Sequence, residues 1–158
     1  MTTFFDELAA YGEPRQHKTV FKVSDVEYEV YFTQITDKNP FDCTVDFHPG
    51  FIKPTYAKHY EIAFDAKLNR TNKTYFRRVK GLPPGSAIKV INYVERAIFD
   101  HYTTFHVGLY TYAPYDFKLS CVYCRLISRP RHAGSSIEVG LEPMGRSHVL
   151  RGQVFNVL

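Results

Sequence analysis

The sequence contains no tryptophan, little cysteine and no long apolar run. No segment approaches the roughly 20 apolar residues that a membrane-spanning helix needs. The N-terminus, MTTFFDEL, lacks the basic region and apolar run of a signal peptide. The three cysteines cannot form an even disulfide framework, which favours a reducing compartment. These absences predict a soluble protein that is neither secreted nor membrane-bound.

The sequence also lacks a strong excess of either positive or negative charge. The net charge is +4, and the basic residues are scattered apart from Arg77-Arg78-Val79-Lys80 and the group Arg125, Arg129 and Arg131. A DNA-binding protein usually shows a denser basic stripe, so nucleic acid is not expected as a partner. Aromatic residues are abundant instead, with 13 Phe and 12 Tyr. Because tyrosine is enriched at interfaces, the surplus favours a protein partner or a homo-oligomer.

The length of 158 residues suits one domain, 1–158, with its own core. Between His17 and Asp65 apolar and polar residues alternate with period two in several short runs, which predicts antiparallel strands. Val26–Thr33, Cys43–His48 and Tyr60–Asp65 are such runs. Before them, Thr3 can cap a short helix that extends to Ala9.

Helical spacing is clearest at 86–101, where Ala87, Val90, Ile91, Val94, Ala97 and Ile98 share one face. The pattern predicts an amphipathic helix with Ser86 as its N-cap. The other predicted elements are a strand Thr74–Val79, a turn Gly81–Gly85, a strand Phe105–Ala113, a helix 116–129 capped by Asp116, and strands Ser136–Glu142 and Val149–Val157. We therefore expect an α+β domain with a mixed, largely antiparallel sheet of six to seven strands.

Motifs for metal or nucleophile chemistry are missing. Cys121 and Cys124 form a C-x-x-C, but it lies in the predicted second helix and has no second pair of ligands. The histidines at 48, 59, 106, 132 and 148 show no metal-ligand spacing, and neither a P-loop nor a nucleophile elbow occurs. No metal site is expected.

Two H-x-T triplets offer one catalytic hypothesis. They are His17-Lys-Thr19 and His101-Tyr-Thr103. Paired H-x-T on two strands is the signature of 2H phosphoesterases, in which the histidines act as acid and base on a phosphodiester. However, His101 closes the predicted main helix, where a histidine also interacts well with the helix dipole.

Four stretches carry a resemblance to a known fold. They read VEYEVYFT, YEIAFDA, GLPPGSAIKVINYVERAIFDHY and FHVGLYTYAPYDFKLSCVYCRLISR, and a strand that ends at Ala113 precedes Val122-Tyr123-x-Arg125-Leu126-x-x-Arg129. This pattern resembles uncharacterised bacteriophage proteins that look like small relatives of the GNAT acetyltransferase fold. The resemblance covers Val26 to Arg129.

That resemblance implies an acetyl-CoA site at the turn before the main helix. GNAT enzymes bind the pyrophosphate there through backbone N–H groups, which would involve Lys80, Gly81, Gly85 and Ser86. Pro83 and Pro84 remove two of those donors. The family's general acid would correspond to Tyr123, for which a place on the apolar stripe is the plainer interpretation.

The aromatic surplus gives the last candidate site. On the predicted 105–113 strand, His106, Tyr110 and Tyr112 alternate with the apolar residues, and Tyr115 follows. If the second helix leaves that face open, it is an aromatic contact surface. The leading hypothesis is a non-enzymatic phage-type binding or assembly module in the virion or the host cytoplasm, without a cofactor. An acetyl-CoA-dependent N-acetyltransferase and a 2H-type phosphodiesterase are the alternatives.

Overall fold

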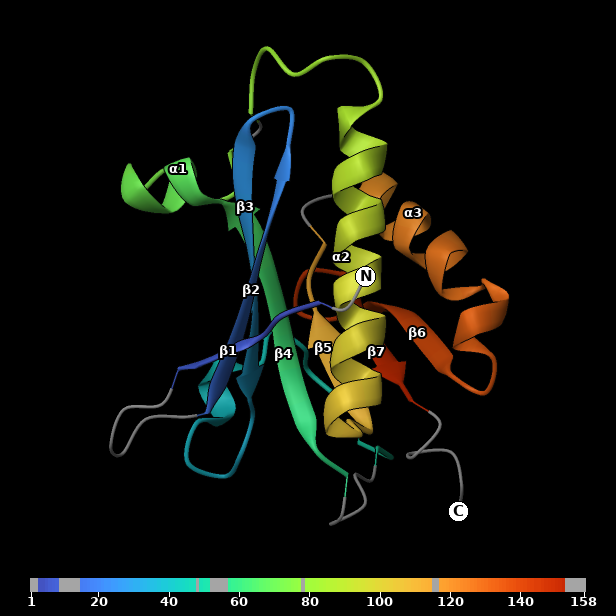
Figure 1. Ribbon diagram of the computed structural model, residues 1–158. Coiled ribbons are helices and arrows are strands. Elements are labelled where there is room, and N and C mark those ends of the chain that lie inside the picture. Colours follow the sequence, from blue (N-terminus) through green and yellow to red (C-terminus); the bar gives the residue numbers. More distant parts are fainter. Residues whose placement is uncertain are drawn as a thin grey trace.

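A computed structural model describes residues 3–8, 15–47, 49–51, 57–77, 79–114 and 117–152, apart from the side chains of 117–119 and 131. Within these residues one sheet has the order β1-β2-β3-β4-β5-β7-β6 (Figure 1). Its strands are β1 (Asp6–Leu8), β2 (Gln16–Val23), β3 (Val26–Gln34), β4 (His59–Ala66), β5 (Leu109–Tyr112), β6 (Ser136–Leu141) and β7 (Ser147–Arg151). The helices are α1 (Lys67–Thr71), α2 (Ser86–Phe105) and α3 (Phe117–Ile127).

The predicted class, α+β with a mixed and largely antiparallel sheet, is confirmed. All neighbouring strand pairs are antiparallel except β4 and β5, which run parallel. A two-residue turn joins β2 to β3, and both of its residues, Ser24 and Asp25, have positive φ of 50° and 65°. Such turns match the twist of the flanking strands, so this hairpin has a favoured geometry.

The main core lies between the sheet and α2, which crosses one face with α3 beside it (Figure 1). The alternation predicted for β3 and β4 is confirmed: Val30, Phe32 and Ile62 point into this core. The helical stripe of α2 meets them with buried Val94 and Ile98. Among the described residues, no helix combines the length and the apolarity that crossing a membrane would require.

The predicted N-terminal helix is wrong. Asp6–Leu8 forms β1, in which Asp6 pairs with Lys18 and Leu8 with Gln16. A helix of this length has few internal hydrogen bonds to repay its nucleation, whereas a strand gains partners from the edge of β2. Phe5 enters the core and makes an edge contact with Phe32 at 5.8 Å between centroids.

The predicted strand Thr74–Val79 is also wrong, because none of its described residues belongs to a strand and Tyr75 and Phe76 form a turn. Lys73 and Phe76 have positive φ of 57° and 60°, which a strand does not allow. Asp65 holds the turn, since its carboxylate accepts a hydrogen bond of 2.7 Å from the backbone N–H of Phe76. The sequence pattern missed this side-chain control of the backbone.

Several element boundaries differ from the prediction. Helix α2 continues to Phe105, so His101 lies inside the helix and β5 begins only at Leu109. Gly85 occupies the N-cap position, and Ser86 is the buried first residue of the helix. The run from Cys43 to Phe47 is outside the sheet. Asp116, the predicted cap of the second helix, and residues 153–157 of the last predicted strand lie outside the described residues.

Candidate functional site

The turn before α2 carries the four residues predicted to bind a pyrophosphate, and they differ in exposure. Lys80, Gly81 and Gly85 are exposed, but Ser86 is buried and its hydroxyl lies 3.3 Å from that of Ser24. The backbone N–H of Ser86 donates to the carbonyl of Pro83 at 3.2 Å. The two prolines have no N–H, so this turn lacks two of the donors that a pyrophosphate loop would use.

Tyr123 is placed in the core, as the plainer interpretation predicted. It is buried on α3, and its ring meets that of Tyr112 edge-on at 5.2 Å. Burial raises the pKa of the Tyr123 hydroxyl well above its ordinary value. The hydroxyl is therefore a weaker acid than that of an exposed tyrosine.

The aromatic surface predicted around β5 is not formed. Tyr110 is 1% exposed and Tyr112 is 5% exposed, because α2 and α3 cover their side of the sheet. His106 is exposed, but it is the C-cap residue of α2 rather than part of a strand. Tyr115 lies outside the described residues. Helices cover this face of β5, so Tyr110 and Tyr112 do not form the exposed contact surface that the sequence suggested.

The two predicted phosphoesterase histidines do meet, but inside the core. His17 Nδ1 and His101 Nε2 are 2.8 Å apart, and His101 Nδ1 lies 2.7 Å from the hydroxyl of Tyr110. Burial lowers the pKa of His101 to about 2 and also lowers that of His17. Thr103 is exposed and bonds to its own helix backbone. The two imidazoles are buried and bonded to each other, so neither is presented to solvent as the acid or base of a phosphodiesterase would have to be.

Two further polar groups are built into the core. Ser120 Oγ lies 2.5 Å from His148 Nε2, and burial lowers the pKa of His148 to about 4. His132 forms a buried pair with Glu95 at 2.6 Å. Beside His132 lies a cavity of about 210 Å³, lined by Phe99, Tyr102, Thr103, Tyr110, His132, Ser135, Leu150 and Gly152. Ligand sites usually exceed about 300 Å³.

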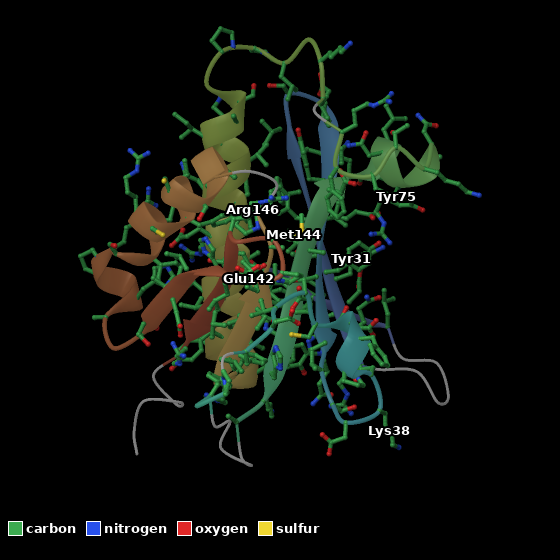
Figure 2. The ribbon with its side chains drawn as sticks, turned by 180° about the vertical axis from the view of Figure 1, so that it is seen from behind. Tyr31, Lys38, Tyr75, Glu142, Met144 and Arg146 are labelled. Atoms are coloured by element: carbon green, nitrogen blue, oxygen red, sulfur yellow. The ribbon has the colours of Figure 1, made fainter. Side chains whose placement is uncertain are left out.

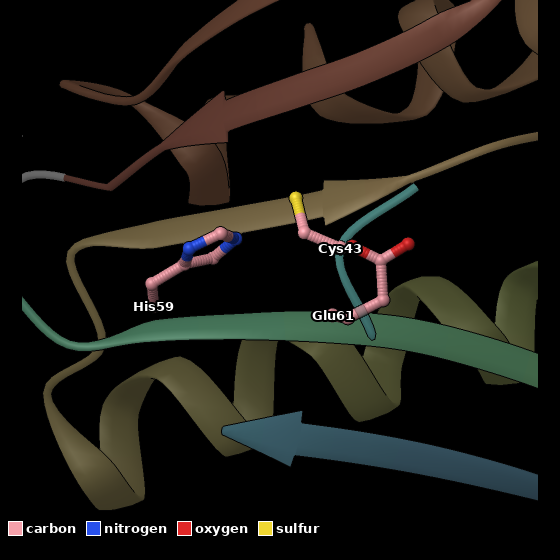
Figure 3. A group of neighbouring side chains, drawn as sticks. All are labelled: Cys43, His59 and Glu61. Carbon is pink, nitrogen blue, oxygen red and sulfur yellow. The ribbon is translucent and has the colours of Figure 1, made fainter. Parts of the chain in front are cut away.

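A mixed donor cluster occupies the opposite face of the sheet. His59 and Glu61 project from the same side of β4, and Cys43 approaches them from the loop that precedes β4 (Figure 3). The sulfur, a ring nitrogen and a carboxylate oxygen lie within 4.8 Å of one another. Such donors bind zinc, so this group is the candidate metal centre among the described residues.

Thr111 on β5 lies at the centre of the cluster. Its hydroxyl is 2.7 Å from His59 Nε2 and 3.6 Å from Cys43 Sγ, and it donates to Glu61. Thr44 also donates to Glu61. Burial raises the pKa of Glu61 to about 7, while the two threonine hydroxyls oppose that shift. Burial likewise raises the pKa of the Cys43 thiol.

One exposed segment, which buried side chains hold in place, was not predicted from the sequence. We name residues 67–77, which comprise α1 and the following turn, the 67–77 segment. It exposes Leu68 by 65%, Tyr75 by 56% and Phe76 by 51%. Figure 2 shows Tyr75 beside α1, on the face that also carries Tyr31 and, near its middle, Met144. In the sequence, this segment lies in the basic run KLNRTNKTYFRR, which contains the adjacent aromatic residues Tyr75 and Phe76.

The anchor of this segment is a buried carboxylate–amide pair. Asp65 accepts hydrogen bonds of 2.8 Å from Asn69 Nδ2 and 2.7 Å from the backbone N–H of Phe76. Asn69 in turn donates to the carbonyl of Arg77 at 2.7 Å and accepts from Thr74. The buried anchor therefore fixes the conformation that exposes the aromatic side chains.

Comparison with protein-family models, with curated proteins and with solved structures finds no match to this chain.

Proposed function

We propose that the protein is a non-enzymatic binding module, which contacts an acidic protein partner through the 67–77 segment. The observation that carries this proposal is the display of Leu68, Tyr75 and Phe76 on a turn with a buried anchor. Apolar side chains that are exposed together on one segment often mark a site of protein contact. A non-glycine residue held at positive φ, as Phe76 is, is typical of functional segments.

Rigidity makes this surface suitable for binding. The hydrogen bonds from Asp65 and Asn69 hold the turn in one conformation before any partner arrives. Binding then orders few additional groups, and the entropy lost on association is smaller than for a flexible loop. Aromatic side chains add large contact area with few rotatable bonds.

The charge of the segment indicates the nature of the partner. Lys67, Arg70, Lys73 and Arg77 are exposed around the apolar residues, and the segment contains no carboxylate. Lys67 and Arg70 pair with Glu27 and Glu29 of β3. Arg70 lies over the ring of Tyr31 at 4.2 Å, which extends the aromatic area onto β3. A basic rim around an apolar centre complements an acidic rim on a protein surface.

The polar clusters of the core support a role without catalysis. The histidines at 17, 101, 132 and 148 are buried and bonded to other protein groups. A general acid or base must reach its substrate. In keeping with the resemblance to phage proteins, we propose that the partner is a phage or host protein, met in the virion or in the host cytoplasm.

A capture experiment with matched variants tests this function. Wild-type protein is immobilised and exposed to an extract of the host cells, with and without nuclease. Tyr75→Ser combined with Phe76→Asn removes the apolar side chains, and asparagine tolerates the positive φ at 76. Phe41→Ser is the control, because Phe41 is 98% exposed at another site.

We expect one or more proteins to bind wild type and the Phe41 variant alike, and to bind the double variant at least about 10-fold less. Retention that is unchanged in the double variant would contradict the proposal. Binding that nuclease abolishes would indicate a nucleic acid partner instead, and a dimer in light scattering of the purified protein would indicate self-association.

An acetyltransferase remains the second candidate, favoured by one observation. The parallel strands β4 and β5 are joined through α2 and followed by α3, which agrees with the strand–helix–strand–helix order of the GNAT resemblance. A thermal-shift titration with acetyl-CoA and CoA tests it. Binding at 100 times Kd would add about 2.7 kcal/mol to the free energy of unfolding. The absence of a shift at millimolar ligand would remove this candidate.

A further inference from the structure

We propose that Cys43, His59 and Glu61 bind one zinc ion behind the sheet. The three side chains supply a thiolate sulfur, an imidazole nitrogen and a carboxylate oxygen, which are the donors that zinc selects in proteins. This site is independent of the binding function proposed above, because it involves neither the 67–77 segment nor its anchors.

The spacing of the donors fits a small cation. Their ligand atoms lie within 4.8 Å of one another. In a tetrahedral site with bonds of about 2.0–2.3 Å, ligand atoms are separated by about 3.5 Å. Shifts of about 1 Å, within reach of side-chain rotation, would therefore bring the three donors to zinc-binding distance. The hydroxyls of Thr44 and Thr111, both bonded to Glu61, are placed to orient that carboxylate or to supply a further oxygen.

The backbone holds two of the donors firmly and presents the third. His59 and Glu61 lie two residues apart on β4, where both pair with β5, opposite Leu109 and Thr111. Cys43 follows the short 3-10 turn Pro40–Asp42, and the segment after it is fastened to the Glu142 carbonyl by a 2.8 Å hydrogen bond from the Asp46 N–H. Zinc would link this segment to β4 through coordination bonds.

Charge supports a dication at this position. A thiolate and a carboxylate together neutralise Zn²⁺, so the occupied site would bury no net charge. Glu61 accepts hydrogen bonds from the Thr44 backbone N–H and from the hydroxyls of Thr44 and Thr111, all of which are uncharged groups. The apolar side chains of Val45, Leu109 and Val149 form the adjoining cluster and would shield the ion from solvent.

The competing interpretation is a closed hydrogen-bond network without metal. The Thr111 hydroxyl donates to Glu61 and can accept from both His59 and Cys43, so the neutral side chains satisfy one another. The two interpretations differ in the importance of Thr111. Thr111→Val removes the centre of the network and leaves the three zinc ligands in place.

Metal binding to the purified protein tests the inference. The full chain is treated with chelator under reducing conditions and then titrated with Zn²⁺ and with Co²⁺. We expect one ion per chain, a raised Tm, and an ultraviolet thiolate-to-cobalt charge-transfer band. Cys43→Ser and Glu61→Gln should each weaken binding by more than about 100-fold, and Thr111→Val should retain the ion and the band.

Two controls keep the result interpretable. Cys121→Ser combined with Cys124→Ser removes the other two thiols and should leave binding unchanged. If Cys43→Ser does not fold, the charge-transfer band of this double variant still reports a Cys43 thiolate on the metal. The proposal is overturned if stoichiometric metal fails to bind, if cobalt binds without the band, or if binding disappears with Cys121 and Cys124.

Discussion

His17 Nδ1 lies 2.8 Å from His101 Nε2, although the two residues are 84 positions apart in the chain. One proton between these nitrogens makes one ring the donor and the other the acceptor, and burial, which lowers the pKa of both rings, favours the neutral form of each. The ring of His101 also stacks on Phe32 at 4.0 Å. The pair thus joins β2 to α2 in an environment that disfavours a second proton.

This neutrality predicts a loss of stability in acid. Burial lowers the pKa of His101 to about 2 and that of His148 to about 4, whereas an unfolded histidine titrates near 6.5. Below pH 6.5 the unfolded chain therefore binds protons that the folded chain does not. Each such histidine should reduce the free energy of unfolding by about 1.4 kcal/mol per pH unit, down to its folded pKa.

Glu61 works in the opposite direction, since its folded pKa is raised to about 7 and protonation stabilises the fold between pH 7 and 4.5. The stability gained when Glu61 is protonated offsets the stability lost at only one of the buried histidines. Urea unfolding at pH 7, 6 and 5, with chelator present, measures the net change in the free energy of unfolding from these groups together. His148→Gln, which does not titrate, should flatten the dependence by about one proton, and an unchanged slope would contradict the assignment.

The anchor of the 67–77 segment predicts a local effect. Asp65→Ala removes the acceptor for the backbone N–H groups of Ala66 and Phe76 and for Asn69. We expect a loss of about 2 kcal/mol and faster tryptic cleavage after Arg70 and Lys73, because the segment becomes free to open. Asp42→Ala removes an exposed carboxylate and should change neither quantity. Equal cleavage of both variants would contradict the role of Asp65.

Gly152 predicts a steric effect. A Cβ atom there would lie 2.6 Å from Tyr102 Cε2 and 2.9 Å from the carbonyl oxygen of Val107. Gly152→Ala should cost about 2 kcal/mol, since α2 and β7 must separate. Gly81→Ala meets nothing within 4 Å and has only the strain of its φ of 79°, about 1 kcal/mol. Thermal unfolding of the two variants separates the effect of crowding from that of backbone strain. A larger loss of stability in Gly81→Ala than in Gly152→Ala would contradict the steric role of Gly152.

Glu95 predicts the largest single loss. It pairs with His132 at 2.6 Å and lies 3.8 Å from Arg129, joining the end of α3 to α2. Glu95→Ala leaves buried His132 without this acceptor, and we expect a cost of about 3 kcal/mol or more in chemical unfolding. Glu7→Ala breaks an exposed pair with Arg15 and should cost less than about 1 kcal/mol. Similar losses in the two variants would show that the core pair contributes little.

Periodicity predicted the elements that bury one face. The strand alternation around Val30 and Ile62 and the helical stripe through Val94 are confirmed. Each depends on a repeated local choice between core and solvent, which a single sequence records well. The helix end was misplaced because Phe105 continues the apolar stripe and contacts the core.

The candidate sites were harder to predict because they depend on contacts between distant residues. Cys43 and Glu61 meet only after the chain folds behind the sheet, and no short motif encodes that meeting. The i, i+2 spacing of His59 and Glu61 on one strand face was the only local sign. The turn at Phe76 likewise depends on Asp65, which lies 11 residues earlier.

The short parallel ladder between β4 and β5 has a consequence for how the chain folds. The two strands pair at three positions, from His59 with Leu109 to Glu61 with Thr111. On either side, antiparallel neighbours close through short connections: β2 with β3, and β6 with β7. Local hairpins form early, whereas a parallel pair requires a long crossover. The two halves of the sheet should therefore assemble separately and join last at β4 and β5, so that this seam is where unfolding begins.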